Sequence, residues 1–180
     1  MLDRANVIEF RVTTDDLVDD MKKPVRCEKA APGYASSFLR VARAPVAVSD
    51  TEADKPFRER LREIHRLLSD DGFEFGHRVY HEATRFAALH ATAGGGGVIE
   101  ALDLQVMQKI LPRLHGSRRQ IEGLLLKLGR YCHHLDAEKA GSTDDPTGWE
   151  REQAKLPRSF EKLCRMLKRL RANQFVSFTE

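Results

Sequence analysis

The sequence has few cysteines and no long apolar run, and both shortages narrow the class of protein. Three cysteines, Cys27, Cys132 and Cys164, are an odd and widely spaced set in 180 residues, so they predict neither a disulfide framework nor a zinc site. No stretch approaches the roughly 20 apolar residues of a membrane span. The start, Met1 to Arg4, lacks the basic-then-apolar plan of a signal peptide. We therefore expect a soluble, cytoplasmic protein with no membrane partner.

The common motifs of nucleotide binding and hydrolysis are also missing. The phosphate-binding pattern G-x-x-x-x-G-K-[ST] does not occur, and the glycine run 94–97, with no lysine after it, is typical of a flexible connector. H-E-x-x-H, G-x-S-x-G and paired C-x-x-C motifs are absent too. His77 and His81 have a spacing that suits a shared metal ion, but no third and fourth ligand accompany them. We predict no metal site.

Charge of one sign is not in large excess. The chain has 30 Lys and Arg residues against 27 Asp and Glu residues, a net charge of +3. That excess is too small to indicate nucleic-acid binding by itself. Apolar residues make up 41% of the chain, which is enough for a core. The length suits one domain, or one domain with appendages.

The amino-terminal third of the chain predicts little regular structure. Residues 7–12, Val-Ile-Glu-Phe-Arg-Val, approach the alternation of a short strand. Residues 15–55 contain three prolines and an acidic cluster, and they predict an irregular insertion with one helical turn near residues 35–43.

From Pro56 onward, apolar residues recur at the spacing of one helix face, and five helices are predicted. The first runs from Pro56 to Ser69, the second begins near Gly76, and the third covers 98–110, where Pro112 ends or kinks it. The fourth follows the capping-box pattern at Ser117 to Gln120, and the fifth covers 159–172. The inward residues of the five helices are, in order, Phe57, Leu61, Ile64 and Leu68; Val79, Ala83, Phe86 and Ala87; Ile99, Leu102, Val106 and Ile110; Ile121, Leu124, Leu125, Leu128 and Cys132; and Phe160, Leu163, Leu167 and Leu170.

Residues 136–157 are polar and predict a linker, and 175–178 predict a short carboxy-terminal strand. The fold class is therefore mainly α, a lid-like bundle of about five helices with a short strand near each end.

Arginines at predicted helix starts are the first candidate site. Arg78 lies in the opening turn of the second helix, and Arg118 and Arg119 lie in that of the fourth. Helix N-termini attract anions, and an arginine there can add a bidentate phosphate contact. The alternative for Arg78 is a surface ion pair with Glu82 four residues later.

A basic stripe on the fifth helix is the second candidate site. Arg158, Lys162, Arg165 and Arg169 follow one another at helical spacing opposite the leucines, and this pattern could follow a phosphate backbone. The alternative is a solvated face or a contact with an acidic neighbour.

Three blocks of the sequence together resemble one family. They are Leu2 to Phe10 (L-D-R-A-N-V-I-E-F), Phe75 to Glu82 (F-G-H-R-V-Y-H-E) and Ala101 to Gly116 (A-L-D-L-Q…K-I-L-P-R-L-H-G). They are similar to segments of the AAA+ ATPases of the McrB type, the motor subunits of 5-methylcytosine-specific restriction systems. The closing 175–178 also fits that family's end.

The resemblance implies that residues 1–14 hold the last core strand of a truncated AAA+ domain and that residues 56–180 form its helical lid. It implies that Arg4 is an arginine finger acting in trans and that Arg78 is the sensor-2 arginine, with Arg118 as the alternative. The parent would hydrolyse ATP or GTP with Mg²⁺ as a hexameric ring, with a nuclease subunit and DNA as partners.

The motifs that bind and hydrolyse nucleotide would precede residue 1. We expect a truncated gene, a misplaced start or a split ATPase, whose chain alone is inactive and needs no cofactor. A non-enzymatic DNA-binding or adaptor module that uses the basic fifth helix is the alternative function.

Overall fold

The structure is a computed structural model that describes residues 7–8, 35–36, 39 and 55–179. The chain divides into two units, one made of Met1–Val7 with Val48–Glu180 and the other of Ile8–Ala47.

The second unit contains few described residues. Ala35, Ser36 and Leu39 are helical, within the range where one helical turn is predicted. Of the strand predicted at residues 7–12, only Val7 and Ile8 are described and neither is in a strand; the others lie outside the described part of the chain.

Helix α2, Lys55–Ser69, begins the bundle in the first unit. Pro56 suits its first turn because the N–H groups there have no partner within the helix. The predicted apolar face is confirmed, since the buried residues of α2 are Phe57, Leu61, Ile64 and Leu68. The chain turns after the helix at Gly72, whose φ of +75° lies in the left-handed region that favours glycine.

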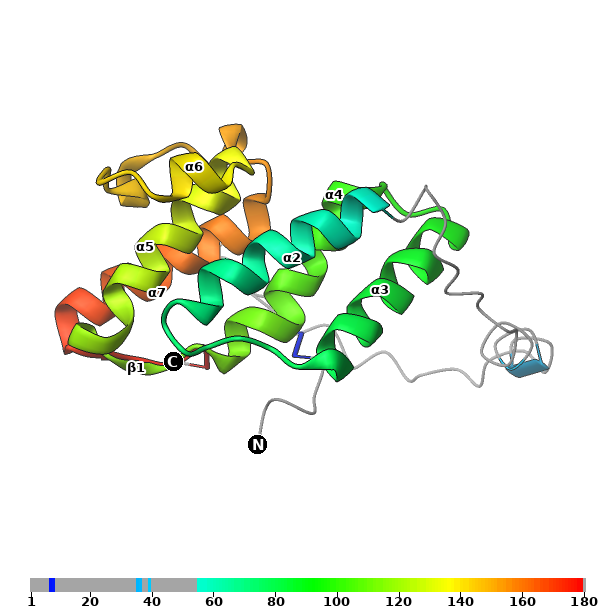
Figure 1. Ribbon diagram of the computed structural model, residues 1–180, viewed down its shortest axis with the longest axis horizontal. Helices are drawn as coiled ribbons and strands as arrows, with labels where there is room; N and C mark the ends of the chain where they lie inside the picture. Colours follow the sequence, from blue (N-terminus) through cyan, green and yellow to red (C-terminus); the bar gives the residue numbers. More distant parts are fainter. Residues whose placement is uncertain (1–6, 9–34, 37–38, 40–54, 180) are drawn as a thin grey trace, which may run out of the picture. The chain divides into compact units, whose positions relative to one another are not determined.

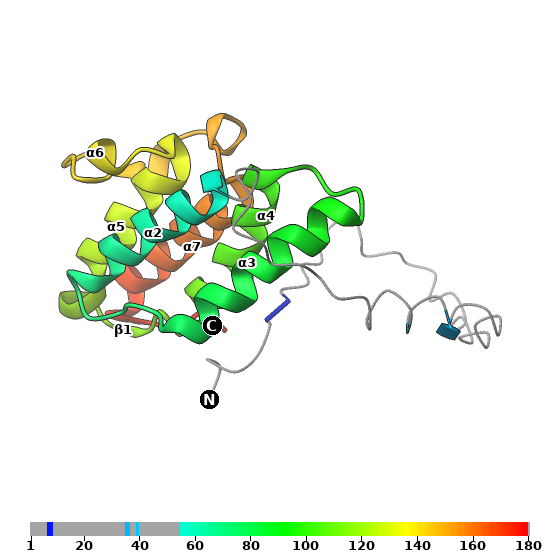
Figure 2. The same ribbon diagram turned by 45° about the vertical axis from the view of Figure 1, so that its right-hand side comes forward.

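Helix α3, His77–Thr92, follows a short extended segment and has Gly76 at its N-cap. Val79 and Ala83 are buried as predicted, whereas Phe86 and Ala87 are only partly buried. Figures 1 and 2 show α3 beside α2 and α4. Among the described elements, α3 packs mainly on α2 and α4, and it buries a narrower stripe than predicted.

Helix α4, Val98–Gln105, continues into a π-helical turn, η4 (Val106–Ile110), and a 3-10 turn, η5 (Leu111–Arg113). The predicted effect of Pro112 is confirmed. Because Pro112 has no N–H to donate to the carbonyl of Gln108, that carbonyl is open to another donor, and it accepts a hydrogen bond from the Val7 N–H at 3.3 Å.

One inward residue of this helix was predicted wrongly. Ile99 is 41% exposed, whereas Leu102, Val106 and Ile110 are buried. The first turn packs against the core through Val98 instead.

Helices α5 (Arg118–His134) and α7 (Pro157–Asn173) lie side by side in Figures 1 and 2. The predicted capping box is confirmed, since the N–H and hydroxyl of Ser117 donate to Oε1 of Gln120 at 3.1 and 2.8 Å. All predicted inward residues of these two helices are buried. Their leucines meet those of α2 and α4 in one apolar core.

The segment predicted as a linker, residues 136–157, is instead folded onto α5. It contains α6 (Ala137–Ala140), η6 (Pro146–Gly148) and η7 (Arg151–Gln153). The buried guanidinium of Arg130 donates to the carbonyls of Ala140 and Asp144 at 2.9 and 2.8 Å. The sequence did not predict this packing, because the segment has no apolar stripe. Backbone carbonyls and Pro146 hold it in place instead.

The carboxy-terminal strand is confirmed. Strand β2, Phe175–Val176, pairs antiparallel with β1, Gly116–Ser117, and Gly116 lies opposite Val176. This short ribbon joins the start of α5 to the end of α7.

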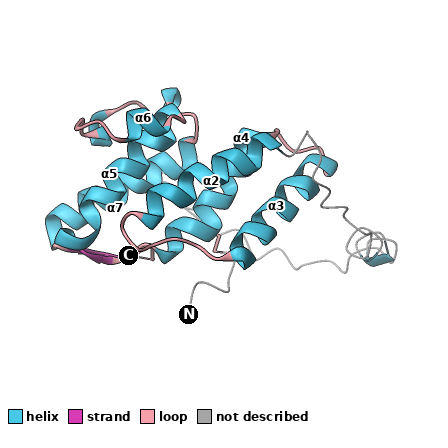
Figure 3. Ribbon diagram, in the orientation of Figure 1, coloured by secondary structure: helices cyan, strands magenta, loops and turns pink. Residues whose placement is uncertain are grey.

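Helix dominates the described part of the chain (Figure 3), so the predicted mainly α fold is confirmed. Among the described residues, no helix has both the length and the apolar character to cross a membrane.

Candidate functional site

In Figure 1 the first turn of α5 lies beside β1, and the first turn of α3 lies along the same lower edge of the bundle, to the right of the ribbon. Arg78 belongs to the first turn of α3, and Arg118 and Arg119 belong to that of α5. The guanidinium of Arg113 donates to the carbonyl of Glu74 at 3.3 Å and so links the segments that precede the two helices. Arg4 lies outside the described residues.

Arg78 is an exposed side chain that pairs with an acid of its own helix. Its Nε donates to Oε1 of Glu82 at 2.8 Å, and 62% of the Arg78 side chain is exposed. The other carboxylate oxygen of Glu82 accepts from Nζ of the buried Lys109 at 2.7 Å. These two cations, Lys109 first, lower the pKa of Glu82. The i,i+4 ion pair expected as the alternative for Arg78 is therefore present.

Arg118 has the same arrangement at the start of α5. Its Nε donates to Oε2 of Glu122 at 2.7 Å, and Nε of Arg171 on α7 donates to Oε1 at 2.9 Å. Hydrogen bonds from Arg118 and then Arg171 lower the pKa of Glu122. Arg119 is exposed beside this pair, in a shallow hollow of about 520 Å³ over the first turns of α5.

The two helix starts differ in how their N–H groups are satisfied. At α5, Ser117 and Gln120 form a capping box, whereas among the described residues no side chain caps α3. Gly76 has no side chain that could cap the first turn of α3, and helix starts attract anions.

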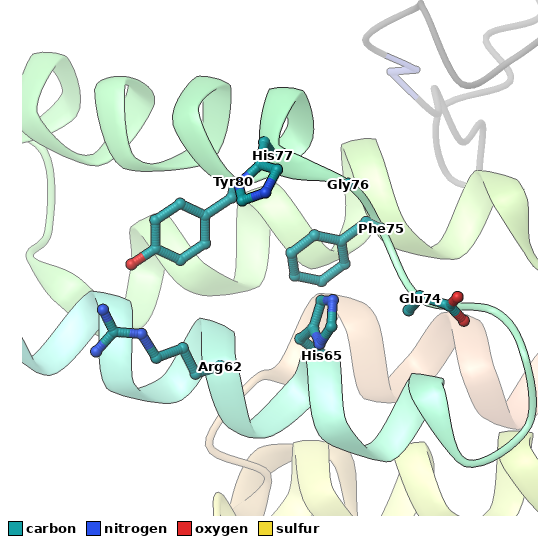
Figure 4. Close-up of a pocket in the computed structure, with 7 residues that line it drawn as sticks. All are labelled: Arg62, His65, Glu74, Phe75, Gly76, His77 and Tyr80. Atoms are coloured by element: carbon teal, nitrogen blue, oxygen red, sulfur yellow. The ribbon is translucent and has the colours of Figure 1, made fainter.

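A cavity of about 530 Å³ lies between α2 and α3 beside this turn. Figure 4 shows the rings of His65, Phe75 and Tyr80 lining the space, with Arg62 beside Tyr80. The His65 and Phe75 rings meet edge to face at 5.0 Å, and Cζ of Arg62 lies 5.9 Å from the centre of the Tyr80 ring. Its full lining consists of Arg62, His65, Glu74, Phe75, Gly76, His77 and Tyr80.

The hydroxyl of Tyr80 is buried and has no hydrogen-bond partner among the described residues. The cavity thus combines apolar aromatic walls with a guanidinium and an unused hydroxyl, features that suit a planar group. Sequence reasoning missed Arg62 and Tyr80, since they come from different helices. The sequence feature that could have indicated an aromatic cavity here is the pair of phenylalanines, Phe73 and Phe75, before Gly76.

The predicted basic stripe on α7 is wrong at one of its four positions. Lys162 is 4% exposed, and its Nζ donates to the carbonyl of Phe178 at 2.6 Å. Arg158 and Arg169 are exposed, and Arg165 is partly buried. Because the carboxy-terminal residues cover Lys162, the four cations do not form a continuous exposed row.

The residues considered as metal ligands are not gathered into a site. His77 and His81 are both exposed, and the described residues contain no group of three or more His, Cys, Asp or Glu that could hold a metal ion. Burial raises the pKa of the Cys132 thiol well above its ordinary value and that of Cys164 to about 11. Neither thiol is therefore ionised near neutral pH.

Comparison with known proteins gives a family match. No curated protein matches the chain, and neither does any solved structure. The family model described as "Domain of unknown function (DUF8727)" matches residues 23–175, a region that includes Arg78, Arg118 and the whole bundle from α2 to the first residue of β2, and leaves Arg4 outside. The chain belongs to the family Domain of unknown function (DUF8727).

Proposed function

We propose that the helical bundle is the lid of an NTPase motor of the McrB-like AAA+ type. In this proposal Arg78 and Arg118 contact the phosphates of ATP or GTP that other polypeptide holds with Mg²⁺. The observation that carries the proposal is the position of the two arginines. Both are exposed in the first turns of two helices that begin along the same lower edge of the bundle in Figure 1.

The ion pairs of these arginines are compatible with phosphate binding. Exposed i,i+4 pairs contribute only about 0.3–0.5 kcal/mol, so exchanging a carboxylate for a phosphate costs little. A bidentate contact between arginine and phosphate is stronger, and the positive ends of the helix dipoles of α3 and α5 favour it further. In the absence of phosphate, Glu82 and Glu122 pair with these arginines. When an arginine moves to the phosphate, its glutamate still pairs with a second cation, Lys109 for Glu82 and Arg171 for Glu122.

The proposal extends to the assembly that the resemblance implies. Arg4 would reach the nucleotide of the adjacent subunit in a hexameric ring and stabilise charge in the transition state. A nuclease subunit and DNA would be further partners of that cytoplasmic motor. Because the sequence has no phosphate-binding loop, we expect no nucleotide hydrolysis by this chain alone.

A titration of the ¹⁵N-labelled chain with Mg²⁺-ATP, Mg²⁺-GTP and tripolyphosphate tests the phosphate contacts. We expect amide shifts at residues 77–79 and 118–120, with similar affinities for the three probes, on the order of 1 mM. Arg78→Ala and Arg118→Ala should each weaken binding by about tenfold.

Arg85→Ala is the matched control, because Arg85 is an exposed arginine of α3 far from its first turn. An equal loss in the Arg85 variant, or unchanged binding in both test variants, would contradict the proposed contacts. Robust hydrolysis of ATP or GTP by the purified chain would contradict the assignment as a lid.

A further inference from the structure

A second cavity, of about 320 Å³, lies at the other end of α5, close to the η6 and η7 turns. Its lining consists of His133, His134, Gly148, Trp149, Glu150 and Gln153, and we name it the histidine–tryptophan pocket. It shares no residue with the arginine sites, so an inference about it stands independently of the proposed function.

Three aromatic rings of this pocket contact one another. The ring centre of His133 lies 4.7 Å from that of His134 and 4.8 Å from that of Trp149, and the His134 and Trp149 centres are 5.0 Å apart. Phe160 of α7 also contacts His133, with 5.0 Å between the ring centres. One wall of the pocket is therefore a continuous surface of aromatic rings.

His133 is buried in this cluster with its polar atoms unused. It is 8% exposed, and neither Nδ1 nor Nε2 has a hydrogen-bond partner among the described residues. Its backbone is fixed, since its carbonyl accepts from the Lys155 N–H at 3.1 Å. Buried polar atoms are normally paired, so an imidazole held rigidly against a pocket with both nitrogens unpaired indicates a missing partner.

The charges around the pocket favour a cation as that partner. Glu150 is the acidic residue of the lining, and no lysine or arginine belongs to the lining. The neighbouring Arg151 is directed to Glu161, at 3.2 Å. Burial, and then His133, lower the pKa of His134, so its ring is uncharged at neutral pH and presents a π face rather than a positive charge.

We propose that the histidine–tryptophan pocket binds an organic cation that carries N–H donors, a primary ammonium or a guanidinium group. The faces of Trp149 and His134 attract a cation. A ring nitrogen of His133 accepts one N–H, and the carboxylate of Glu150 balances the charge. A quaternary ammonium would leave His133 unpaired, and an anion would meet Glu150. The cation is either a lysine or arginine side chain of another protein or a free amine.

Trp149 makes the pocket directly measurable, because it is the single tryptophan of the chain. Titration of the full chain at constant ionic strength should give a saturable change of tryptophan fluorescence with n-butylammonium and with n-butylguanidinium. Tetramethylammonium should bind at least about fivefold more weakly, and n-butanol should give no saturable change. Absence of a saturable response to both N–H-bearing cations, or equal affinity for tetramethylammonium, would overturn the proposal.

Two further probes separate the sources of the cation. Tighter binding of N-acetyl-lysine methylamide than of spermidine would assign the pocket to a protein side chain, and the reverse order would assign it to a free polyamine. Either order supports the shared chemistry.

The exposed residue Glu150 supplies a variant that should fold normally. Glu150→Gln should weaken n-butylammonium binding by about fivefold. The matched control is Glu152→Gln, which changes an exposed acid of η7 outside the lining and should leave the affinity unchanged. Equal affinity in the two variants would overturn the role of Glu150.

His133→Leu tests the imidazole itself. The variant should lose binding and yet unfold at the same or a higher denaturant concentration, because it removes an unpaired buried polar group. A purely structural histidine would give the opposite result, a clear loss of stability. Retained binding would overturn the proposal.

Discussion

The carboxylate of Asp103 on α4 caps helix α7 from across the bundle. Its Oδ1 accepts from the N–H of Ser159 at 2.8 Å and from the hydroxyl of Ser159 at 2.6 Å, and its Oδ2 accepts from the N–H of Arg158 at 3.0 Å. Asp103 and Ser159 are 3% and 0% exposed. The first-turn donors of α7 are therefore satisfied by a buried side chain 55 or 56 residues away in the sequence.

Asp103→Ala should lower the free energy of unfolding by about 2–3 kcal/mol, because it leaves buried donors of α7 without an acceptor. Urea unfolding followed by circular dichroism measures the loss. Asp136→Ala is the control, since Asp136 caps the short exposed turn α6 through the N–H groups of Glu138 and Lys139, and it should cost at most about 1 kcal/mol. Similar losses of unfolding free energy in the two variants would contradict the prediction that the buried cap Asp103 stabilises the protein more than the exposed cap Asp136.

The two tyrosines of the bundle should respond differently to loss of their hydroxyls. Tyr131 is fully buried and donates to Oε2 of Glu63 at 2.7 Å, whereas the Tyr80 hydroxyl has no partner in the described part of the chain. Tyr131→Phe should cost about 1–2 kcal/mol. Tyr80→Phe should cost close to nothing, because no hydrogen bond is lost. Urea unfolding of both variants compares them, and equal losses would show that Tyr80 has a partner in solution.

The helices could be predicted from the sequence because burial repeats at the helical period. Phe57 and Leu61 on α2, like Leu163 and Leu167 on α7, are buried where their spacing places them. The positions of Arg78 and Arg118 in first turns could be predicted for the same reason, since local cap signals at Gly76 and Ser117 define where the helices begin.

Contacts between distant parts of the chain could not be predicted. Nothing near Ser159 indicates that its cap is Asp103, and helical spacing places Lys162 beside the exposed cations although the tail at Phe178 covers it. The cavities depend on the same kind of contact. His133 and Trp149 meet only because the polar segment after α5 folds back onto it.

Acid should destabilise the bundle partly through Glu82. Because Lys109 and Arg78 hold its folded-state pKa below the ordinary value of 4.5, the unfolded chain takes up a proton first as the pH falls. The stability contributed by Glu82 is present above pH 4.5 and is lost below it, towards the lower folded-state pKa. The contribution is under about 1 kcal/mol, since 37% of the side chain is exposed.

Glu82→Gln should therefore unfold more easily at pH 7 and lose less stability than the unmodified chain between about pH 5 and about pH 3. Chemical denaturation across this range measures both effects. Glu59→Gln, at an exposed position of α2, is the control and should follow the unmodified chain. If the stability of the Glu82 variant falls with pH in parallel with that of the unmodified chain, this carboxylate does not contribute to the acid sensitivity.

Lys162 should act as an anchor for the carboxy-terminal residues rather than as an exposed cation. Its Nζ donates to the carbonyl of Phe178 at 2.6 Å and lies 4.1 Å from the centre of the Phe178 ring. Lys162→Met keeps the apolar stem but removes the charged donor, so it should cost about 1–2 kcal/mol and speed amide exchange at residues 176–179. Lys168→Met, at an exposed position of α7, should change neither quantity. If the two variants show the same amide exchange and the same stability, Lys162 does not hold the carboxy-terminal residues. Its ammonium would then be exposed in solution, like the exposed arginines of α7.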